Sequence, residues 1–323
     1  MTKFTAEFAI QAEQYQTSTS AASSKSVSTS SPFYIGVDGG GTKCRVRLED
    51  AAGHCLGEGV AGSANIMRDT DVAKASMLEA ISNAISQSGQ SISLSDCVVG
   101  AGLAGANIPA AHARILQWQH PFKAFYVISD LHAACIGAHE GQEGSVIIVG
   151  TGSTGAHYKQ GHFYELGGHG FPIGDKASGA WMGLKAIQHT LEVIDGLAHK
   201  DKLADAVIGQ FSIDAPHELV QLCGHYTAKE FAEIAPLVVS LANQGVPKAQ
   251  EILREAANYI QRMAHALLRD NSAPLCLIGG LAQSIGGLLD VTTQQRIKSC
   301  AQAPEQGAIH HARYVHSSKE TCR

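Results

Sequence analysis

The chain has 323 residues, a formal net charge of −5 at pH 7 and a charged fraction of 16%. This length allows two domains with substantial cores, and the lack of a basic excess argues against nucleic acid as a partner. No run of about 18 apolar residues occurs, so no membrane partner is expected. The eight cysteines are scattered singly, which is typical of reduced thiols in a cytoplasmic protein.

The first 32 residues differ in composition from the rest. From Gln16 to Ser31 the chain is almost entirely Ser, Thr and Ala. Such a segment cannot bury enough apolar surface to offset its chain entropy. Residues 1–32 are therefore expected to form a disordered N-terminal extension.

The first folded domain is expected to begin at Phe33 with a hairpin. Apolar residues alternate with others over 34–38 and 44–48, as in half-buried strands. The turn between them combines glycines, a hydroxyl and an ammonium in the order Gly39-Gly40-Gly41-Thr42-Lys43. Glycines allow backbone N–H groups to approach an anion and permit φ > 0, while Asp38 could hold hydrated Mg²⁺. The motif is not a Walker A loop, and a loose hairpin without a ligand is the alternative.

The elements that follow alternate between strands and helices. The pattern predicts strands over 55–60, 97–103 and 125–128 and helices over 70–86, 109–119 and 131–139. Residues 97–103 are apolar without polar alternation, which suits a strand covered on both faces. Ser129-Asp130 closes the strand 125–128, where side chains emerge at the sheet edge.

After a hinge at 140–144 the pattern starts again. Residues 146–149 predict a buried strand, Gly150 to Gly155 a second turn of small residues, and 156–159 and 162–165 further strands. This repeat indicates a duplicated domain. A glycine-dense connection follows over 167–179. Helices are expected over 180–194, 202–208, 228–243, 246–269 and 305–314, and a strand over 275–278 that ends in Gly279-Gly280.

Several separated motifs, in this order, resemble one family. They are Asp38 to Lys43, Gly62 to Met67, Ser129-Asp130, Gly150 to Ser153, Gly168 to Ala180 and Ile278 to Gly280. The chain resembles the BadF/BadG/BcrA/BcrD-type ATPase family of the sugar kinase/Hsp70/actin superfamily. Within it, the match is to the bacterial N-acetylglucosamine and glucosamine kinase branch, over about residues 34–310.

The resemblance implies an α/β fold of two duplicated ribonuclease H-like (actin-like ATPase) domains. Each would be a mixed sheet flanked by helices, with a cleft between them. The N-terminal domain would span 33–141, completed by a C-terminal helix from 303–323, and the larger C-terminal domain would span 142–302. The family also suggests a homodimer.

The resemblance further implies a site for ATP, Mg²⁺ and an amino sugar. ATP would contact Gly40, Gly41, Thr42, Lys43, Thr151, Gly152, Gly279, Gly280 and Ser284. Asp38 would hold Mg²⁺ through water, and Asp130 would be the catalytic base. The sugar would contact Asn65, Asp130, Ser153, Thr154, Gly168, His169, Gly170 and Asp175.

Some of these residues have structural alternatives. Asp130 could instead cap the helix at Leu131, and Asp175 could cap the helix that holds Trp181. Asn65 could serve only to stabilise a turn, and His169 could be a surface histidine. Two departures from the family pattern also stand out: Lys176 replaces an acidic residue, and Ile309-His310-His311 replaces an aliphatic run. The second leaves the docking of the last helix open.

The predicted function is an ATP-dependent kinase that phosphorylates the 6-hydroxyl of N-acetylglucosamine or glucosamine. One alternative within the family is an ATPase activator of a CoA-ester dehydratase or reductase, but the cysteines show no arrangement for an iron–sulfur cluster. Another is a non-catalytic, sugar-sensing nucleotide-binding protein.

Overall fold

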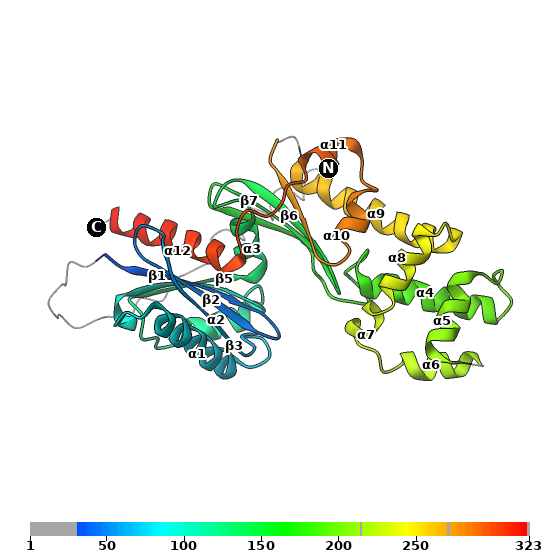
Figure 1. Cartoon of the computed structure of the whole chain (residues 1–323), viewed down its shortest axis with the longest axis horizontal. Coiled ribbons are helices and arrows are strands. Elements are labelled where there is room, and N and C mark those ends of the chain that lie inside the picture. Colours follow the sequence, from blue (N-terminus) through cyan, green and yellow to red (C-terminus); the bar gives the residue numbers. More distant parts are fainter. Residues whose placement is uncertain (1–30, 214, 270–271, 322–323) are drawn as a thin grey trace. The chain divides into compact units, whose positions relative to one another are not determined.

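The computed structural model describes residues 31–213, 215–269 and 272–321 (Figure 1). Residues 1–30 of the predicted N-terminal extension lie outside this range. The chain divides into two compact units. The first contains the described residues up to Gly144, Tyr158–Phe163 and the described residues from Cys300 onward. The second contains Ser145–His157 and the described residues of Tyr164–Ser299.

The first unit is built on a five-stranded sheet in the order β3-β2-β1-β4-β5. Its strands are β1 (Phe33–Gly39), β2 (Cys44–Glu49), β3 (Cys55–Ala61), β4 (Cys97–Leu103) and β5 (Ala124–Ser129). β1 is antiparallel to β2 but parallel to β4, and β4 is parallel to β5. The parallel strands therefore end at one edge, where Asp38 is in register with Gly102.

Helices cover both faces of this sheet. α1 (Thr70–Ser88) and α2 (Pro109–Leu116) lie on one face, and α3 (Asp130–Ala138) and α12 (Pro304–Thr321) lie on the other (Figure 1). All seven residues of β4 are buried, which confirms the expected strand without polar alternation. α1 begins where Asp69 accepts hydrogen bonds from the N–H groups of Asp71 and Val72, a typical N-cap.

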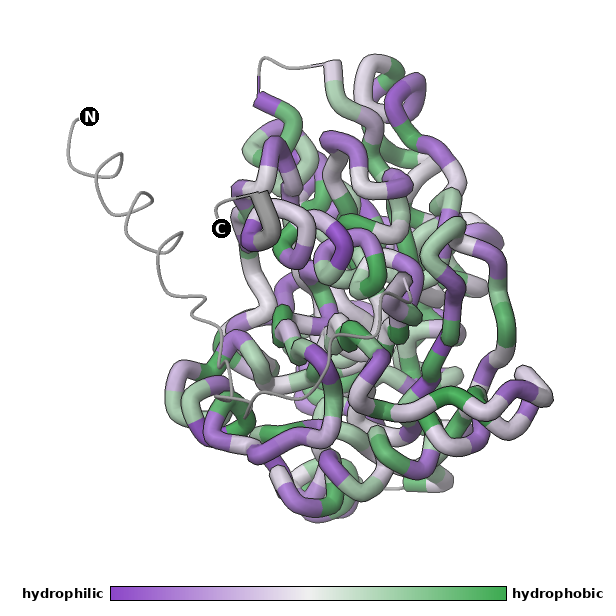
Figure 2. The backbone as a smooth tube through the Cα atoms, turned by 90° about the vertical axis from the view of Figure 1, so that its left-hand side faces the viewer, coloured by the Kyte–Doolittle hydropathy of each residue, from purple (hydrophilic) through white to green (hydrophobic). Residues whose placement is uncertain are grey.

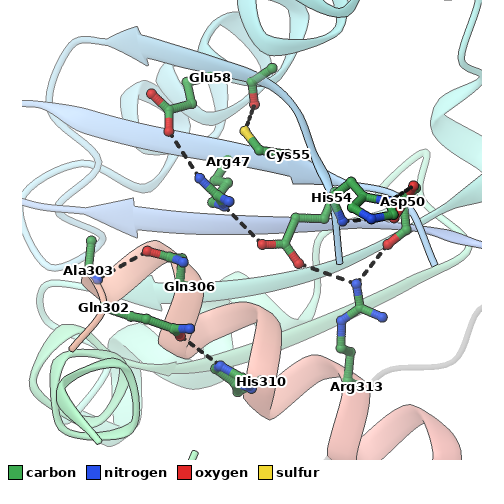
Figure 3. A network of polar contacts seen from close by, with 12 residues as sticks. Arg47, Asp50, His54, Cys55, Glu58, Gln302, Ala303, Gln306, His310 and Arg313 are labelled. Atoms are coloured by element: carbon green, nitrogen blue, oxygen red, sulfur yellow. Dashed lines mark hydrogen bonds and ion pairs between the residues drawn. The ribbon is translucent and has the colours of Figure 1, made fainter. Parts of the chain in front are cut away.

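The last helix, whose docking the sequence left open, packs on the sheet of the first unit (Figure 3). The Arg313 guanidinium donates to Glu49 Oε2 at 3.3 Å and to the backbone oxygens of Asp50 and Ala51 at 2.7 and 2.9 Å. Arg47 holds the same Glu49 carboxylate at 2.8 Å. Polar contacts of Arg313 thus help to hold α12 on this sheet, together with the buried apolar residues Ala308, Ile309 and Ala312.

The second unit is built on a four-stranded sheet in the order β8-β7-β6-β9. Its strands are β6 (Gly144–Val149), β7 (Ser153–Lys159), β8 (His162–Gly167) and β9 (Leu275–Ile278). β6 has the hairpin partner β7 on one side and the parallel strand β9 on the other, just as β1 lies between β2 and β4. The predicted α/β class with two helix-flanked mixed sheets is confirmed.

Helices make up most of the second unit. They are α4 (Gly179–Ile194), α5 (Lys202–Phe211), α6 (Pro216–Cys223), α7 (Ala228–Ala232), α8 (Ala235–Asn243), α9 (Pro247–Leu268), α10 (Ala282–Gly286) and α11 (Val291–Arg296). The single helix predicted over 228–243 is wrong, because Pro236 lacks an N–H and begins a new helix. The short helices α6, α10 and α11 were not predicted.

The tip of the β7–β8 hairpin belongs to a different unit from the one expected. Tyr158–Phe163 was placed in the C-terminal domain, but it groups with the first unit. The reason is aromatic packing: the ring of Phe163 stacks on that of His132 in α3, with centroids 3.9 Å apart. The turn residue Gly161 also approaches Tyr314 of α12.

Hydrophobic residues occur along the backbone in short segments interrupted by hydrophilic ones (Figure 2). Among the described residues, no helix is both long and apolar enough to cross a membrane.

Candidate functional site

The β1–β2 turn is held in place by backbone hydrogen bonds. The Gly40 N–H donates to the Lys43 oxygen at 3.0 Å, and the Gly40 oxygen accepts from the Ala64 N–H at 3.0 Å. Gly41, Thr42 and Lys43 are exposed. The turn therefore presents exposed N–H groups, a hydroxyl and an ammonium next to the Gly62-to-Met67 loop.

Of the three turn glycines, Gly39 is the one that is needed for space, and none of them adopts the positive φ that glycine permits. Gly39, Gly40 and Gly41 all lie outside the left-handed region. A Cβ on Gly39 would be 2.6 Å from the Leu103 side chain, whereas a Cβ on Gly41 would meet nothing within 4 Å. Gly39 thus packs the turn onto β4, and Gly41 leaves open space where an anion could approach the backbone.

Asp38 lies at the end of β1, beside other carboxylates. Burial raises its pKa to about 6, and the negative charges of Glu305 and Asp130 add to this rise, while Arg45 and Lys43 oppose it. The neighbouring residue on β4 is Gly102, which has no side chain to separate Asp38 from Asp130. This edge of the sheet therefore concentrates negative charge.

Asp130 is not the N-cap of α3, so that alternative is wrong. Ser129 is the cap, because its Oγ accepts the His132 N–H at 3.1 Å. Asp130 is the first helical residue, and its Oδ1 accepts the Leu131 N–H at 2.9 Å. Burial raises the pKa of Asp130, which the Leu131 hydrogen bond partly offsets.

The side chain of Asn65 stabilises a turn, which was the alternative to its expected contact with the sugar. Its Oδ1 accepts the N–H groups of Met67 and Arg68 at 3.0 and 3.1 Å. The oxygen is thereby committed to the backbone, as in an Asx-turn. A sugar could be contacted only through the side-chain NH₂, which donates no recorded hydrogen bond within the described residues.

The second turn, in the other unit, is fastened to the start of α4. The Gly150 N–H donates to the Gly152 oxygen at 2.9 Å. The backbone oxygens of Gly150 and Thr151 accept from the first residues of α4, Gly179 and Ala180, at 2.8 and 3.3 Å. Thr151 remains exposed. The turn is rigid at its ends and open at its tip.

Asp175 lies against this turn instead of capping α4. The cap is Ser178, whose Oγ accepts the Trp181 N–H at 3.1 Å. Asp175 has φ 55°, and its Oδ1 accepts the Gly170 N–H at 3.1 Å. Its Oδ2 is 2.5 Å from where a Cβ on Gly152 would stand. Asp175 therefore joins the glycine-dense loop to the second turn.

The hydroxyls of Ser153 and Thr154 are already used as donors. Ser153 Oγ donates to the Lys176 oxygen at 2.7 Å, and Thr154 Oγ1 donates to the Leu166 oxygen at 3.4 Å. A sugar could reach these hydroxyls only as a hydrogen-bond donor. By contrast, three predicted sugar contacts are exposed, namely Gly168, His169 and Gly170.

The segment after β9 meets the end of β6. The Leu281 N–H donates to the Val149 oxygen at 3.2 Å, and a Cβ on Gly279 would be 2.3 Å from that oxygen. Gly279 also has φ 108°, so it must be glycine for two reasons. Gly280 is exposed, and Ser284 follows on α10. Gly279, Gly280 and the second turn thus lie at one edge of this sheet.

Lys176, which departs from the family pattern, points to an acidic partner. Its Nζ is 2.7 Å from Glu255 Oε1 on α9 and 5.6 Å from the centroid of the Trp181 ring. The reversed charge at position 176 is therefore balanced locally.

The structure gathers the predicted residues into two groups, one in each unit. The first contains Asp38, Gly40 to Lys43, Asn65 and Asp130. The second contains Thr151 to Thr154, Gly168 to Gly170, Asp175, Gly279 and Gly280, with Ser284 on the following helix. The sequence did not single out Glu305 or Arg45, which both act on the charge of Asp38. The signal available for Glu305 was an acidic residue two positions before Gly307-Ala308.

Comparison with known proteins places this arrangement in a family. Residues 35–309 match the model of the BadF/BadG/BcrA/BcrD ATPase family. A glucosamine kinase of Vibrio cholerae is 37% identical over 278 residues, which cover 86% of this chain and 94% of the relative. An N-acetylmuramic acid/N-acetylglucosamine kinase of Clostridium acetobutylicum is 28% identical, covering 80% and 88%.

Solved structures agree in fold. A candidate N-acetylglucosamine kinase from Chromobacterium violaceum superposes with a TM-score of 0.76 at 32% identity, covering 87% of this chain and 99% of the other. A hexokinase of the ROK family from Thermus thermophilus, at 16% identity and a TM-score of 0.54, shares the fold alone; the match covers 88% and 99% of the chains.

Proposed function

The chain belongs to the BadF/BadG/BcrA/BcrD ATPase family, and we propose that it is an ATP-dependent kinase of amino sugars. The proposal rests above all on the V. cholerae glucosamine kinase, which is 37% identical over nearly its whole length. The acceptor is the 6-hydroxyl of glucosamine or N-acetylglucosamine. The related kinases act on both kinds of sugar by name.

In this proposal, the two turns hold the phosphates of ATP. Phosphoryl transfer depends on positioning and charge neutralisation more than on covalent chemistry. Gly40 to Lys43 offer N–H groups and an ammonium, and Thr151 and Gly152 offer the second set of donors. Gly279, Gly280 and Ser284 would lie along the rest of the nucleotide.

Asp130 is the proposed catalytic base. A sugar hydroxyl is a weak nucleophile, and a carboxylate within hydrogen-bond reach can orient it and accept its proton. The bond between the sugar O6 and the γ-phosphorus forms, the bond from that phosphorus to the bridging oxygen breaks, and ADP leaves. The raised pKa of Asp130 makes its carboxylate a stronger base than an exposed aspartate.

The residues around Asp38 suit a magnesium ion. Mg²⁺ prefers oxygen ligands, retains several waters and binds through one or two carboxylates together with substrate phosphates. No cluster of three or more His, Cys, Asp or Glu poised to hold a metal occurs among the described residues, so a complete protein cage is not part of the proposal. When bound, Mg²⁺ would neutralise charge on the phosphates, with Asp38 holding it through water.

The sugar is proposed to contact Asn65 through its NH₂ group and Asp175 through its carboxylate. Gly168, His169 and Gly170 form the exposed loop beside Asp175, while Ser153 and Thr154 can accept hydrogen bonds.

We further propose that residues 1–32 form an N-terminal extension, that the protein is a homodimer and that it is located in the cytoplasm. The free state of the seven described cysteines agrees with a reducing compartment.

The test is ADP release measured with glucosamine, N-acetylglucosamine, glucose and no sugar. We expect release to require one of the two amino sugars, and the ratio of kcat/KM values identifies the preferred one. A 6-deoxy analogue should not support turnover, because it lacks the accepting hydroxyl. ADP release that is the same with every sugar and without sugar would contradict the kinase function.

A further inference from the structure

Glycines bring the start of α12 unusually close to the sheet of the first unit. A Cβ on Gly36 would be 1.8 Å from the Glu305 oxygen, and a Cβ on Gly100 would be 2.0 Å from the Ala308 oxygen. Gly36 and Gly100 are neighbours in register on β1 and β4. Any side chain at these positions would push the helix away, so the two glycines fix where α12 begins.

This close approach places Glu305 beside Asp38. Gly36 and Asp38 are two residues apart on β1 and therefore face the same side of the sheet. Glu305 lies in the first turn of α12, and its backbone oxygen is the atom that Gly36 approaches most closely. Two carboxylates thus lie within electrostatic reach at the same edge, with Asp130 nearby.

The Glu305 carboxylate has no structural task that explains its position. Its Oε2 is buried without a hydrogen-bond partner in the described part of the chain. The start of α12 is satisfied by another residue, since Gln306 Oε1 accepts the Ala303 N–H at 3.3 Å. A negative charge near the start of a helix interacts favourably with the helix dipole, but this interaction does not require the carboxylate to be buried. A buried, unpartnered oxygen beside another carboxylate is costly unless a cation joins them.

We infer that Glu305 is a second carboxylate for the divalent cation that accompanies ATP, acting together with Asp38. This inference rests on the proposed function. It assigns both protein carboxylates that Mg²⁺ typically uses in phosphoryl-transfer sites. The two come from segments about 270 residues apart in the sequence, which the glycine contacts of α12 bring to one edge.

The experiment measures Mn²⁺ binding by the loss of its free EPR signal in the presence of ADP, so that no turnover is needed. Wild type is compared with Glu305→Gln, which keeps the size of the side chain, and with Glu305→Asp, which keeps its charge. The matched control is Glu79→Gln, because Glu79 is exposed on α1. We expect a roughly 10- to 100-fold higher Kd for Mn²⁺ in Glu305→Gln, an intermediate Kd in Glu305→Asp and no change in the control.

A melting experiment without metal separates this role from a structural one. Removing a repelling charge should leave the melting temperature of Glu305→Gln equal to or above that of wild type, and Mn²⁺ with ADP should raise it less. A wild-type Kd in Glu305→Gln would overturn the inference and leave the kinase function intact. Failure of wild type to retain Mn²⁺ with ADP would overturn the proposed metal site and the inference together.

Discussion

The carboxylate of Asp175 lies directly against Gly152. Its Oδ2 is 2.5 Å from where a Cβ at position 152 would stand, and its Oδ1 is held by the Gly170 N–H. Asp175 was expected in the sugar site and Gly152 in the phosphate turn, and the two residues lie in direct contact in the second unit. The two functions are coupled by sterics, and a change at one residue must displace the other.

Gly152→Ala should impair turnover through Asp175. The added methyl group would force the carboxylate to move by about 1 Å, a misplacement that can reduce the rate by roughly 10²-fold. Steady-state kinetics should show the loss in kcat/KM for the sugar. Gly209→Ala is the control, since a Cβ there meets nothing within 4 Å; it should keep full activity. Equal activity of the two variants would contradict the coupling.

Asp130→Asn should lower kcat by roughly 10²–10⁴-fold if Asp130 is the base, with little change in melting temperature. Ser129→Ala is the matched comparison, because Ser129 and not Asp130 caps α3. Loss of the cap should lower the free energy of unfolding by about 1 kcal/mol. Near-normal kcat in Asp130→Asn, measured with saturating sugar and ATP, would remove Asp130 from the catalytic role.

Local sequence pattern was sufficient for much of the fold. The alternation around Cys44, Val46 and Leu48 and the apolar run over 97–103 depend only on neighbours along the chain. Both strand–turn–strand units were therefore predicted. The single helix predicted over 228–243 is wrong because Pro236 cannot donate a backbone hydrogen bond and lies in the first turn of a new helix, α8.

Other features depend on residues far apart and could not be read from local pattern. The sequence pattern offered Asp130 as a cap of α3, and only the backbone path shows that Ser129 holds that position. The Asn65 oxygen turned inward to two N–H groups, a choice that leaves no trace in the sequence. The start of α12, which carries Glu305, lies against β1 and β4 only because glycines on these two strands allow its backbone to approach.

Exchanging the charges of Lys176 and Glu255 tests whether the unusual lysine is only a local partner. Their atoms are 2.7 Å apart and both side chains are over a third exposed, so the pair should contribute about 0.2–1 kcal/mol. Lys176→Glu should lower the free energy of unfolding by this order, and adding Glu255→Lys should restore it. A double-mutant cycle by urea denaturation measures the coupling. If the double variant regained stability but not activity, Lys176 would have a role toward the nucleotide.

The contact between His132 and His311 predicts that the fold is acid-sensitive. Burial lowers the pKa of His311 to about 4 and lowers that of His132 well below its ordinary value. Since an unfolded histidine titrates near 6.5, the unfolded chain binds more protons below that pH. The contribution of these two histidines to the free energy of unfolding is therefore fully present above about pH 6.5. It is lost as the pH falls toward 4, by up to about 1.4 kcal/mol per pH unit for each histidine.

In His311→Gln, about one proton fewer should be taken up on unfolding below pH 6.5, so the free energy of unfolding should depend less steeply on pH. The free energy of unfolding measured by urea at pH 7 and pH 5 gives the slope. The control is His225→Gln, because His225 is exposed and its replacement should leave the slope unchanged. An unchanged slope in His311→Gln would mean that His311 becomes protonated without cost in the native state.

Arg313→Lys tests whether polar contacts hold the last helix. Lysine keeps the charge but not the planar fork that serves Glu49 and two backbone oxygens at once. Glu49 is only 7% exposed, and buried acceptors that lose a donor cost about 1–3 kcal/mol each. We expect the free energy of unfolding to fall by about 2 kcal/mol.

Arg262→Lys is the control for Arg313→Lys. The Arg262 guanidinium lies over the Tyr259 ring, as that of Arg313 lies over the Tyr34 ring, but the Arg262 side chain is exposed. This variant should change stability by less than about 0.5 kcal/mol. If Arg313→Lys were equally stable, apolar packing alone would hold α12. A loss of Mn²⁺ affinity in Arg313→Lys that accompanies its loss of stability would instead show that the position of Glu305 depends on this anchor.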